Sequence, residues 1–112
     1  MKLPGGEWAV VDVAKLRDYC LSASHVRGRH KARVFGSVLG ITSADAEFVR
    51  GELLRAAREE EALASDIDEY GARYTIDFNL VCGSRRAVVR SAWIVLRGET
   101  VPQLTSCYVL SN

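Results

Sequence analysis

Apolar residues change their spacing once along this 112-residue chain, near residue 71, and that change restricts the fold more than any other feature. Before it, apolar side chains recur roughly every three to four residues, which is the period of one helix face. After it, residues 74–80 alternate between apolar and polar side chains, as in an antiparallel strand buried on one side. The sequence therefore predicts an α+β fold in which helices are followed by an antiparallel sheet.

About three helices are expected before the change. The first spans about residues 13–21, and the second spans about residues 29–39 and ends at Gly40. The third begins after an N-cap at Thr42 or Ser43 and is expected to run past residue 60, with a fraying acidic end. We expect the acidic residues that follow to form a solvated helix end and a loop.

The sheet is expected to be a meander of three to four strands. Residues 74–80, 86–96 and 103–110 form strands, and residues 82–85 form a turn. The long apolar run in the second of these strands predicts a central position. An additional edge strand is expected at residues 7–11. Helices would cover one face of the sheet and leave the other face open to a ligand.

Length and composition indicate a single domain over residues 1–112 with its own core, because the chain is 48% hydrophobic and contains only two prolines. The three cysteines are widely spaced and form no C-x-x-C pair, so they predict neither a disulfide framework nor a zinc site. No segment is apolar enough to act as a signal peptide or a membrane span. We therefore expect a cytoplasmic protein that does not bind membranes.

The net charge of +1 conceals a strong segregation of charge along the chain. Residues 1–41 contain seven Lys or Arg and three Asp or Glu, whereas residues 42–70 contain three and nine. Residues 71–112 are basic again, with five and two. The acidic segment is a solvated surface in one interpretation; in the other, folding joins the two basic segments into a single face.

Positive charge is concentrated where the second helix begins, in the segment "SASHVRGRHKARVFGSVLG". Cations at a helix N-terminus are unfavourable unless an anion binds there. Lys31 lies on the apolar stripe of this helix, where it must snorkel outward, pair with a carboxylate or point into a cleft. Gly28 leaves backbone N–H groups open, and His25 lies in the loop before them. Together these residues predict a phosphate site.

Several polar residues interrupt the strands. Arg90 stands on one face of the middle strand, where it requires either an ion pair with Asp77 or a ligand. Thr105 and Ser106 lie in the last strand, where cross-strand hydrogen bonds are the alternative to a functional role. Trp93 is expected in the core. The sequence contains no dinucleotide loop, nucleophile elbow or metal-ligand spacing, and we expect no metal and no other cofactor.

The order of motifs resembles an uncharacterised bacterial domain family. The shared features are H-x5-K-A-x2-F from His25, the Tyr70-Gly71 pair, a strand tryptophan, and a Pro-x-Leu segment followed by Thr105. This family is similar to the barnase/EndoU/colicin/RelE-like ribonuclease superfamily, which includes toxin domains. The resemblance implies a helices-then-sheet layout with the active site on the sheet. Gln103 is a departure, because an arginine is usual at that position in the relatives.

The resemblance and the cationic residues together imply a small metal-free endoribonuclease, a toxin of a toxin–antitoxin or effector system, that uses the RNA 2′-OH as nucleophile. The expected partners are RNA and a cognate antitoxin protein. The alternative is a non-catalytic module that binds RNA or protein through the same basic face. The expected catalytic residues are His25, Lys31, Arg90 and Thr105. The expected substrate-binding residues are Arg27, Arg29, Arg73, Ser91 and Ser106.

Overall fold

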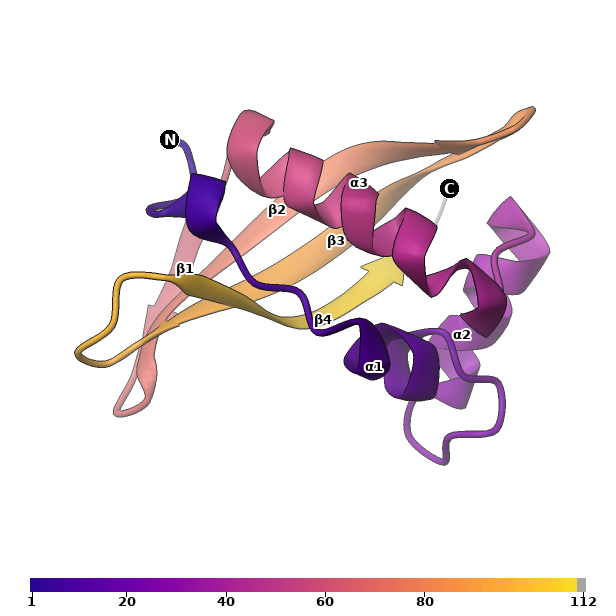
Figure 1. Ribbon diagram of the computed structural model, residues 1–112, viewed down its shortest axis with the longest axis horizontal. Helices are drawn as coiled ribbons and strands as arrows, with labels where there is room; N and C mark the ends of the chain where they lie inside the picture. Colours follow the sequence, from indigo (N-terminus) through magenta and orange to yellow (C-terminus); the bar gives the residue numbers. More distant parts are fainter. Residues whose placement is uncertain (111–112) are drawn as a thin grey trace.

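The structure, a computed structural model, describes residues 1–110 and contains helical elements followed by a four-stranded antiparallel sheet (Figure 1). The helical elements are a 3₁₀ turn at Gly6–Trp8, α1 (Val13–Lys15) continued by a π turn (Leu16–Cys20), α2 (Arg29–Val34) continued by a π turn (Phe35–Leu39), and a 3₁₀ turn (Ser43–Asp45) leading into α3 (Ala46–Glu59). The strands are β1 (Leu63–Ile67), β2 (Gly71–Cys82), β3 (Arg85–Leu96) and β4 (Pro102–Val109). The predicted α+β fold class is confirmed.

The predicted helices form where local signals place them. The second helix ends at Gly40, whose φ of 69° is a left-handed conformation that favours glycine. Thr42 and Asp45 form a capping box at the start of the third helical segment. That segment ends at Glu59, because Glu60 already has an extended backbone. α3 then lies across the sheet, with α1 and α2 at one end of it (Figure 1).

The strands pair in the order β1-β2-β3-β4, so β3 lies inside the sheet as predicted. Alternate side chains of β2 and β3, including Ile76, Val89 and Trp93, point toward the helices and are buried. Burying each such side chain contributes about 1.5–3 kcal/mol. The opposite face carries no helix (Figure 1), and we call it the open face.

Two expectations for the edges of the sheet are wrong. Residues 7–11 do not form a strand; only Val10 pairs with Gln103, as an isolated parallel bridge beside β4. The extra strand is instead β1, which lies within the acidic segment expected to be a loop. β1 is five residues long and every one of them is exposed, so its own sequence carries almost no strand signal. It forms because β2 supplies an antiparallel partner.

None of the helices in residues 1–110 has the length and apolar character needed to cross a bilayer.

Candidate functional site

The register of the sheet places Asp77, Arg90 and Tyr108 side by side on three neighbouring strands. Arg90 donates two hydrogen bonds to Asp77, from Nε to Oδ1 at 2.8 Å and from Nη2 to Oδ2 at 2.9 Å. The pair is bidentate, and its side chains are 38% and 37% exposed. The ion-pair alternative predicted for Arg90 is therefore the one found, and the pair lies at the surface.

Each partner shifts the protonation of the other. The hydrogen bond from Arg90 and its positive charge lower the pKa of Asp77 below its ordinary value. The hydrogen bond to Asp77, the charge of Asp77 and the neighbouring Tyr108 hydroxyl raise the pKa of Arg90. Both groups are therefore charged at neutral pH, and the guanidinium keeps the N–H groups that Asp77 does not occupy.

Lys31 joins this group from a different element. α2 lies beside β4, and the Lys31 Nζ atom is 4.6 Å from the centroid of the Tyr108 ring. The side chain is exposed, so it reaches outward from the apolar stripe on which its backbone stands. Lys31, Asp77, Arg90 and Tyr108 form what we call the open-face cluster, with two cations, one carboxylate and one aromatic ring.

The His25 ring accepts hydrogen bonds from the backbone just before α2, a role that its sequence context did not predict. Its Nδ1 accepts hydrogen bonds from the backbone N–H groups of Arg27 at 3.0 Å and Gly28 at 3.1 Å, immediately before α2. Its ring also contacts Tyr19 edge-on, with centroids 4.6 Å apart. The N–H groups that were expected to bind a phosphate are thus partly taken up by His25, which corrects that expectation. Because Nδ1 is an acceptor, the proton of the neutral ring is on Nε2.

Gly28 is required for this loop to close. A Cβ atom at residue 28 would lie 2.3 Å from the Tyr19 carbonyl oxygen, so only glycine fits there. No hydrogen bond or ion pair within residues 1–110 joins His25 to the open-face cluster. The loop and the cluster are therefore two separate features.

The two polar residues of the last strand lie beside the open-face cluster. Thr105 is the extra residue of a β-bulge opposite Ala92 and Trp93, and its hydroxyl donates to the Ala92 carbonyl at 3.1 Å. Ser106 is paired with Ala92, two positions along β3 from Arg90, and is half-buried. Ser106 therefore lies on the open face, whereas the Thr105 hydroxyl is bonded to the backbone of β3.

Three other expected residues lie elsewhere. Arg27 and Arg29 are exposed next to the His25 loop, and Arg73 pairs with Asp68 at 2.8 Å.

Ser91 is the clearest departure from the expected site. It is fully buried, donates a hydrogen bond to the Ile76 carbonyl at 2.9 Å and accepts one from Trp93 Nε1 at 2.9 Å. A hydroxyl held in this way has no access to a substrate, so Ser91 belongs to the core rather than to the site. Trp93 is buried beside it, as expected.

Tyr108 is the residue that the sequence analysis did not place in the site. An aromatic residue in a strand usually belongs to the core, so the sequence around Tyr108 does not by itself place it in a surface site. The signal that identifies it is the alternation of β4, in which Cys107 and Val109 are buried and the residue between them is not. Its position beside Arg90 depends on the bulge at Thr105.

Two cysteines from different elements lie together in the core. Cys20 and Cys107 are both buried, and all three cysteines are free thiols. The hydrogen bond with Cys107 is the main cause that lowers the pKa of Cys20 to about 7, and Lys15 and Lys31 add to it. The same hydrogen bond, together with burial, raises the pKa of Cys107.

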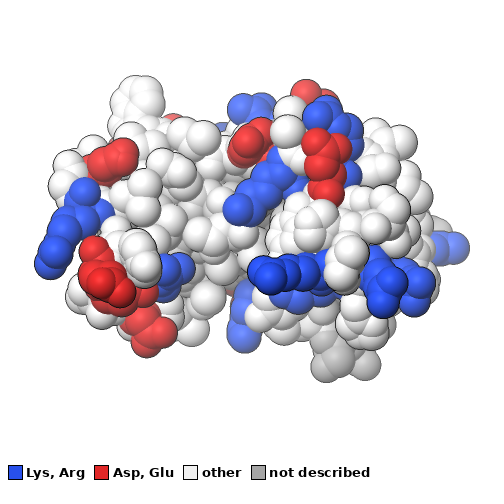
Figure 2. Space-filling view, turned by 90° about the horizontal axis from the view of Figure 1, so that it is seen from below, with Lys and Arg blue, Asp and Glu red and all other residues white. Residues whose placement is uncertain are grey.

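Lys and Arg side chains extend across the end of the molecule formed by α1 and α2 when it is viewed from below Figure 1 (Figure 2). No group of three or more His, Cys, Asp or Glu side chains within residues 1–110 is arranged to hold a metal ion. The part of the chain that the structure describes also encloses no pocket. The side chains of the open-face cluster are partly or fully exposed on the surface of the sheet.

Comparisons with known proteins agree with this fold. A contact-dependent growth inhibition toxin–immunity protein complex from Klebsiella pneumoniae 342 contains a chain similar to this one, with a TM-score of 0.67 and 15% sequence identity. The likeness covers 91% of this chain and 100% of that chain, and at such low identity it shows the fold alone. Among curated proteins, no sequence matches. A family model described as a domain of unknown function (DUF6883) matches residues 2–111, and the chain belongs to that family.

Proposed function

We propose that the protein is a metal-independent endoribonuclease, the toxin module of a two-protein system, and that RNA binds across the open face of the sheet. The observation that carries the proposal is that Lys31 lies over the Tyr108 ring and that Arg90 lies beside Tyr108 on the neighbouring strand. Two cations next to an aromatic ring, on an exposed face, suit a phosphodiester and the base or ribose beside it.

The reaction that fits these groups is cleavage by the RNA itself. The 2′-oxygen attacks the adjacent phosphorus and loses its proton, the P–O5′ bond breaks, and the 5′-oxygen gains a proton. The products are a 2′,3′-cyclic phosphate and a free 5′-hydroxyl. Lys31 and Arg90 would stabilise the negative charge that builds up on the phosphate oxygens.

His25 and Asp77 are the residues that would act at the 5′-oxygen and at the 2′-oxygen of the RNA. His25 has its N–H on Nε2 and would donate a hydrogen bond from it to the leaving 5′-oxygen, which would take its proton from a water molecule, because a neutral imidazole does not release its remaining proton at neutral pH. The hydroxide left behind would be neutralised by the 2′-proton. Asp77 is the carboxylate of the open-face cluster and would accept the 2′-proton; its lowered pKa makes it a weak base, so a slow enzyme is expected. Thr105, at the bulge, would orient the ribose. The scissile phosphate must then lie between Asp77 and the Nε2 atom of His25.

The toxin assignment also draws on the fold shared with a chain of a toxin–immunity complex. A toxin that acts on cellular RNA works in the cytoplasm and requires a cognate antitoxin or immunity protein. The cytoplasmic location and the cognate protein are both part of the proposal.

A non-catalytic RNA-binding module is the second candidate. It is favoured by the bidentate Arg90–Asp77 pair, which neutralises one cation of the cluster, and by the use of His25 as a cap. Such a module would bind RNA in a salt-dependent manner without cleaving it.

The deciding experiment incubates the purified protein with single-stranded RNA and tRNA in the presence of EDTA. His25→Asn is the key variant, because the Asn side-chain oxygen can keep the cap on the Arg27 and Gly28 amides while the Nε2 donor is lost. His30→Asn, on the exposed side of α2, is its matched control. Lys31→Gln is compared with Arg33→Gln on the same helix.

Cleavage that leaves 2′,3′-cyclic ends, lost in His25→Asn and Lys31→Gln but retained in both controls, supports the enzyme. RNA that is bound but intact on every substrate supports the binding module and contradicts the enzyme.

A further inference from the structure

In the part of the chain that the structure describes, the N-terminal residues form hydrogen bonds with one edge strand of the sheet, β4, but not with the other edge strand, β1. On the β4 side, the Val10 N–H donates to the Pro102 carbonyl at 2.9 Å, and the Val10 carbonyl accepts from the Leu104 N–H at 3.1 Å. On the β1 side, the N-terminus covers only the approach to the strand, where the Ala62 N–H donates to the Met1 carbonyl at 2.7 Å. Within residues 1–110, nothing pairs with the outer edge of Leu63–Ile67.

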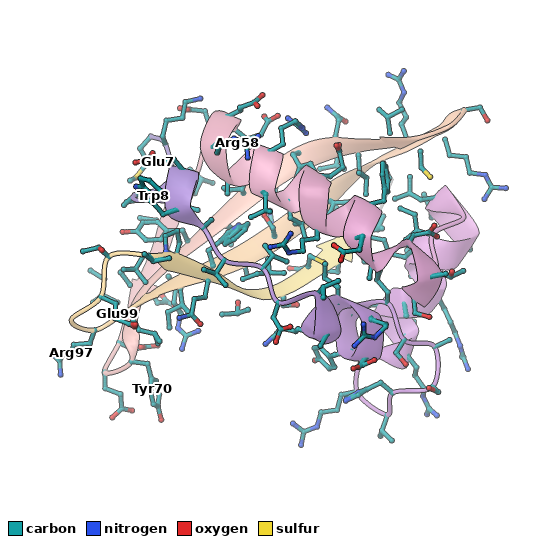
Figure 3. All side chains as sticks on the ribbon, viewed as in Figure 1. Glu7, Trp8, Arg58, Tyr70, Arg97 and Glu99 are labelled. Atoms are coloured by element: carbon teal, nitrogen blue, oxygen red, sulfur yellow. The ribbon has the colours of Figure 1, made fainter. Side chains whose placement is uncertain are left out.

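This open edge is also apolar on both of its faces. Leu63, paired with Thr75, is on the open face and is 70% exposed, whereas Ile67, paired with Ala72, is on the other face and is 87% exposed. Tyr70 follows in the turn to β2 and is 62% exposed (Figure 3). Proteins usually blunt an edge strand with charge or a bulge, because its free N–H and C=O groups can pair with another strand. β1 has a bulge between Ala64 and Ile67, yet it keeps these apolar side chains in solvent.

The negative charge of residues 61–70 favours a positively charged partner at this edge. Residues 61–70 contain four acidic residues and no Lys or Arg. Glu61 is paired with the N-terminal amine and Lys2, and Asp68 is paired with Arg73. Asp66 and Glu69 have no ion-pair partner within residues 1–110. A second copy of this chain would bring the same unneutralised carboxylates to the shared ribbon, which is unfavourable.

We propose that β1 is a docking edge for a partner protein that adds an extended segment of alternating basic and apolar residues to the sheet. The backbone groups of Leu63–Ile67 would supply the hydrogen bonds, Leu63 and Ile67 the apolar contacts, and Asp66 and Glu69 the charge selection. This edge lies at the end of the sheet away from α1 and α2, so a partner here leaves the open-face cluster uncovered (Figure 1). The proposal does not depend on ribonuclease activity.

The test uses the full-length, isotope-labelled protein and two synthetic peptides about eight residues long, one alternating lysine with valine and the other glutamate with valine. NMR titration follows every backbone amide. The lysine peptide is expected to shift the amides of residues 62–75 and to bind at least about tenfold more tightly than the glutamate peptide, with an affinity that falls as salt rises.

Asp66→Lys is expected to weaken the lysine peptide by about tenfold, because it reverses an exposed charge on the edge. Glu99→Lys is the matched control: it makes the same reversal in the β3–β4 turn at the same end of the molecule and should leave binding unchanged (Figure 3). Both substitutions are on exposed residues, and thermal unfolding confirms that both variants fold.

Three results would overturn the proposal: equal binding of the two peptides, shifts centred outside residues 62–75, or a free protein that already dimerises through β1 in light scattering.

Discussion

Arg90 and Ser91 are neighbours on β3, and both are polar residues in an apolar strand, yet the fold gives them opposite roles. Ser91 faces the helices, is fully buried and holds the Trp93 indole through a hydrogen bond. Arg90 faces the other way, pairs with Asp77 and lies next to Tyr108. One residue stabilises the core and the other belongs to a surface site. A polar residue in a strand is therefore informative only when the face on which it lies is known.

The largest effect is expected for the aromatic residue on the buried side. Trp93→Ala should lower the free energy of unfolding by about 3–5 kcal/mol, because it leaves a cavity and removes the hydrogen bond that the indole donates to Ser91. Tyr108→Leu, on the open face, should change it by less than about 1 kcal/mol. Urea unfolding followed by circular dichroism measures both. Comparable losses in the two variants would remove the distinction between the two faces.

Arg90→Gln should strongly reduce RNA cleavage and change the stability of the protein little. The rate of RNA cleavage, as kcat/KM, should fall by about 100-fold, because a cation that stabilises the transition state is lost. Stability should change little, since the Arg90–Asp77 pair is exposed and solvent screens it. Single-turnover cleavage and urea unfolding, measured on the same preparation, give both values. An active Arg90→Gln protein would exclude Arg90 from the proposed chemistry.

Ser91→Ala should destabilise the protein by about 1–3 kcal/mol, because the buried Trp93 N–H loses its acceptor. Ser106→Ala, at a half-buried position facing the opposite way, should cost less than about 0.5 kcal/mol. RNA binding by the folded Ser91→Ala protein should be unchanged. If binding falls while the protein remains folded, Ser91 takes part in the site after all.

The smallest effect concerns the pH dependence of stability. The pKa of Asp77 is lowered in the folded state, so its stabilising contribution is present above its ordinary value of 3.8 and is lost as the pH falls through the folded-state pKa. Asp77→Asn should therefore be less stable than the wild type at neutral pH by less than about 1 kcal/mol, and this difference should shrink in acid. Thermal unfolding from neutral pH to acid measures it; a gap that widens in acid would contradict the assignment.

The helices and the last three strands were predictable because each depends on residues close together in sequence. The capping box at Thr42, the stop at Gly40 and the alternation after Gly71 are local signals, and the structure follows all three. β1 was not predictable, because five exposed and partly acidic residues have no apolar period. It is a strand only because β2, which comes later in the chain, pairs with it.

The candidate site also contains residues that were predictable from the sequence and residues that were not. Lys31 and Arg90 could be selected from sequence because each is a charged residue on an otherwise apolar face. Tyr108 could not, because an aromatic residue in a strand gives the same signal in a core as at a surface. The capping role of His25 also required the loop to be folded, since its ring nitrogen meets amides two and three residues away only in that conformation.

The sequence by itself therefore determined the α+β order of the elements, the ends of the helices and the residues that are too charged to be buried, because these follow from local propensity and from the free energy of burial. The tertiary structure decided which of those charges meet. The register of β2, β3 and β4 joined Arg90 to Asp77 and Tyr108, and the packing of α2 beside β4 brought Lys31 to the same ring. Such contacts join residues far apart in the chain, and only the packed fold holds them at hydrogen-bonding distance.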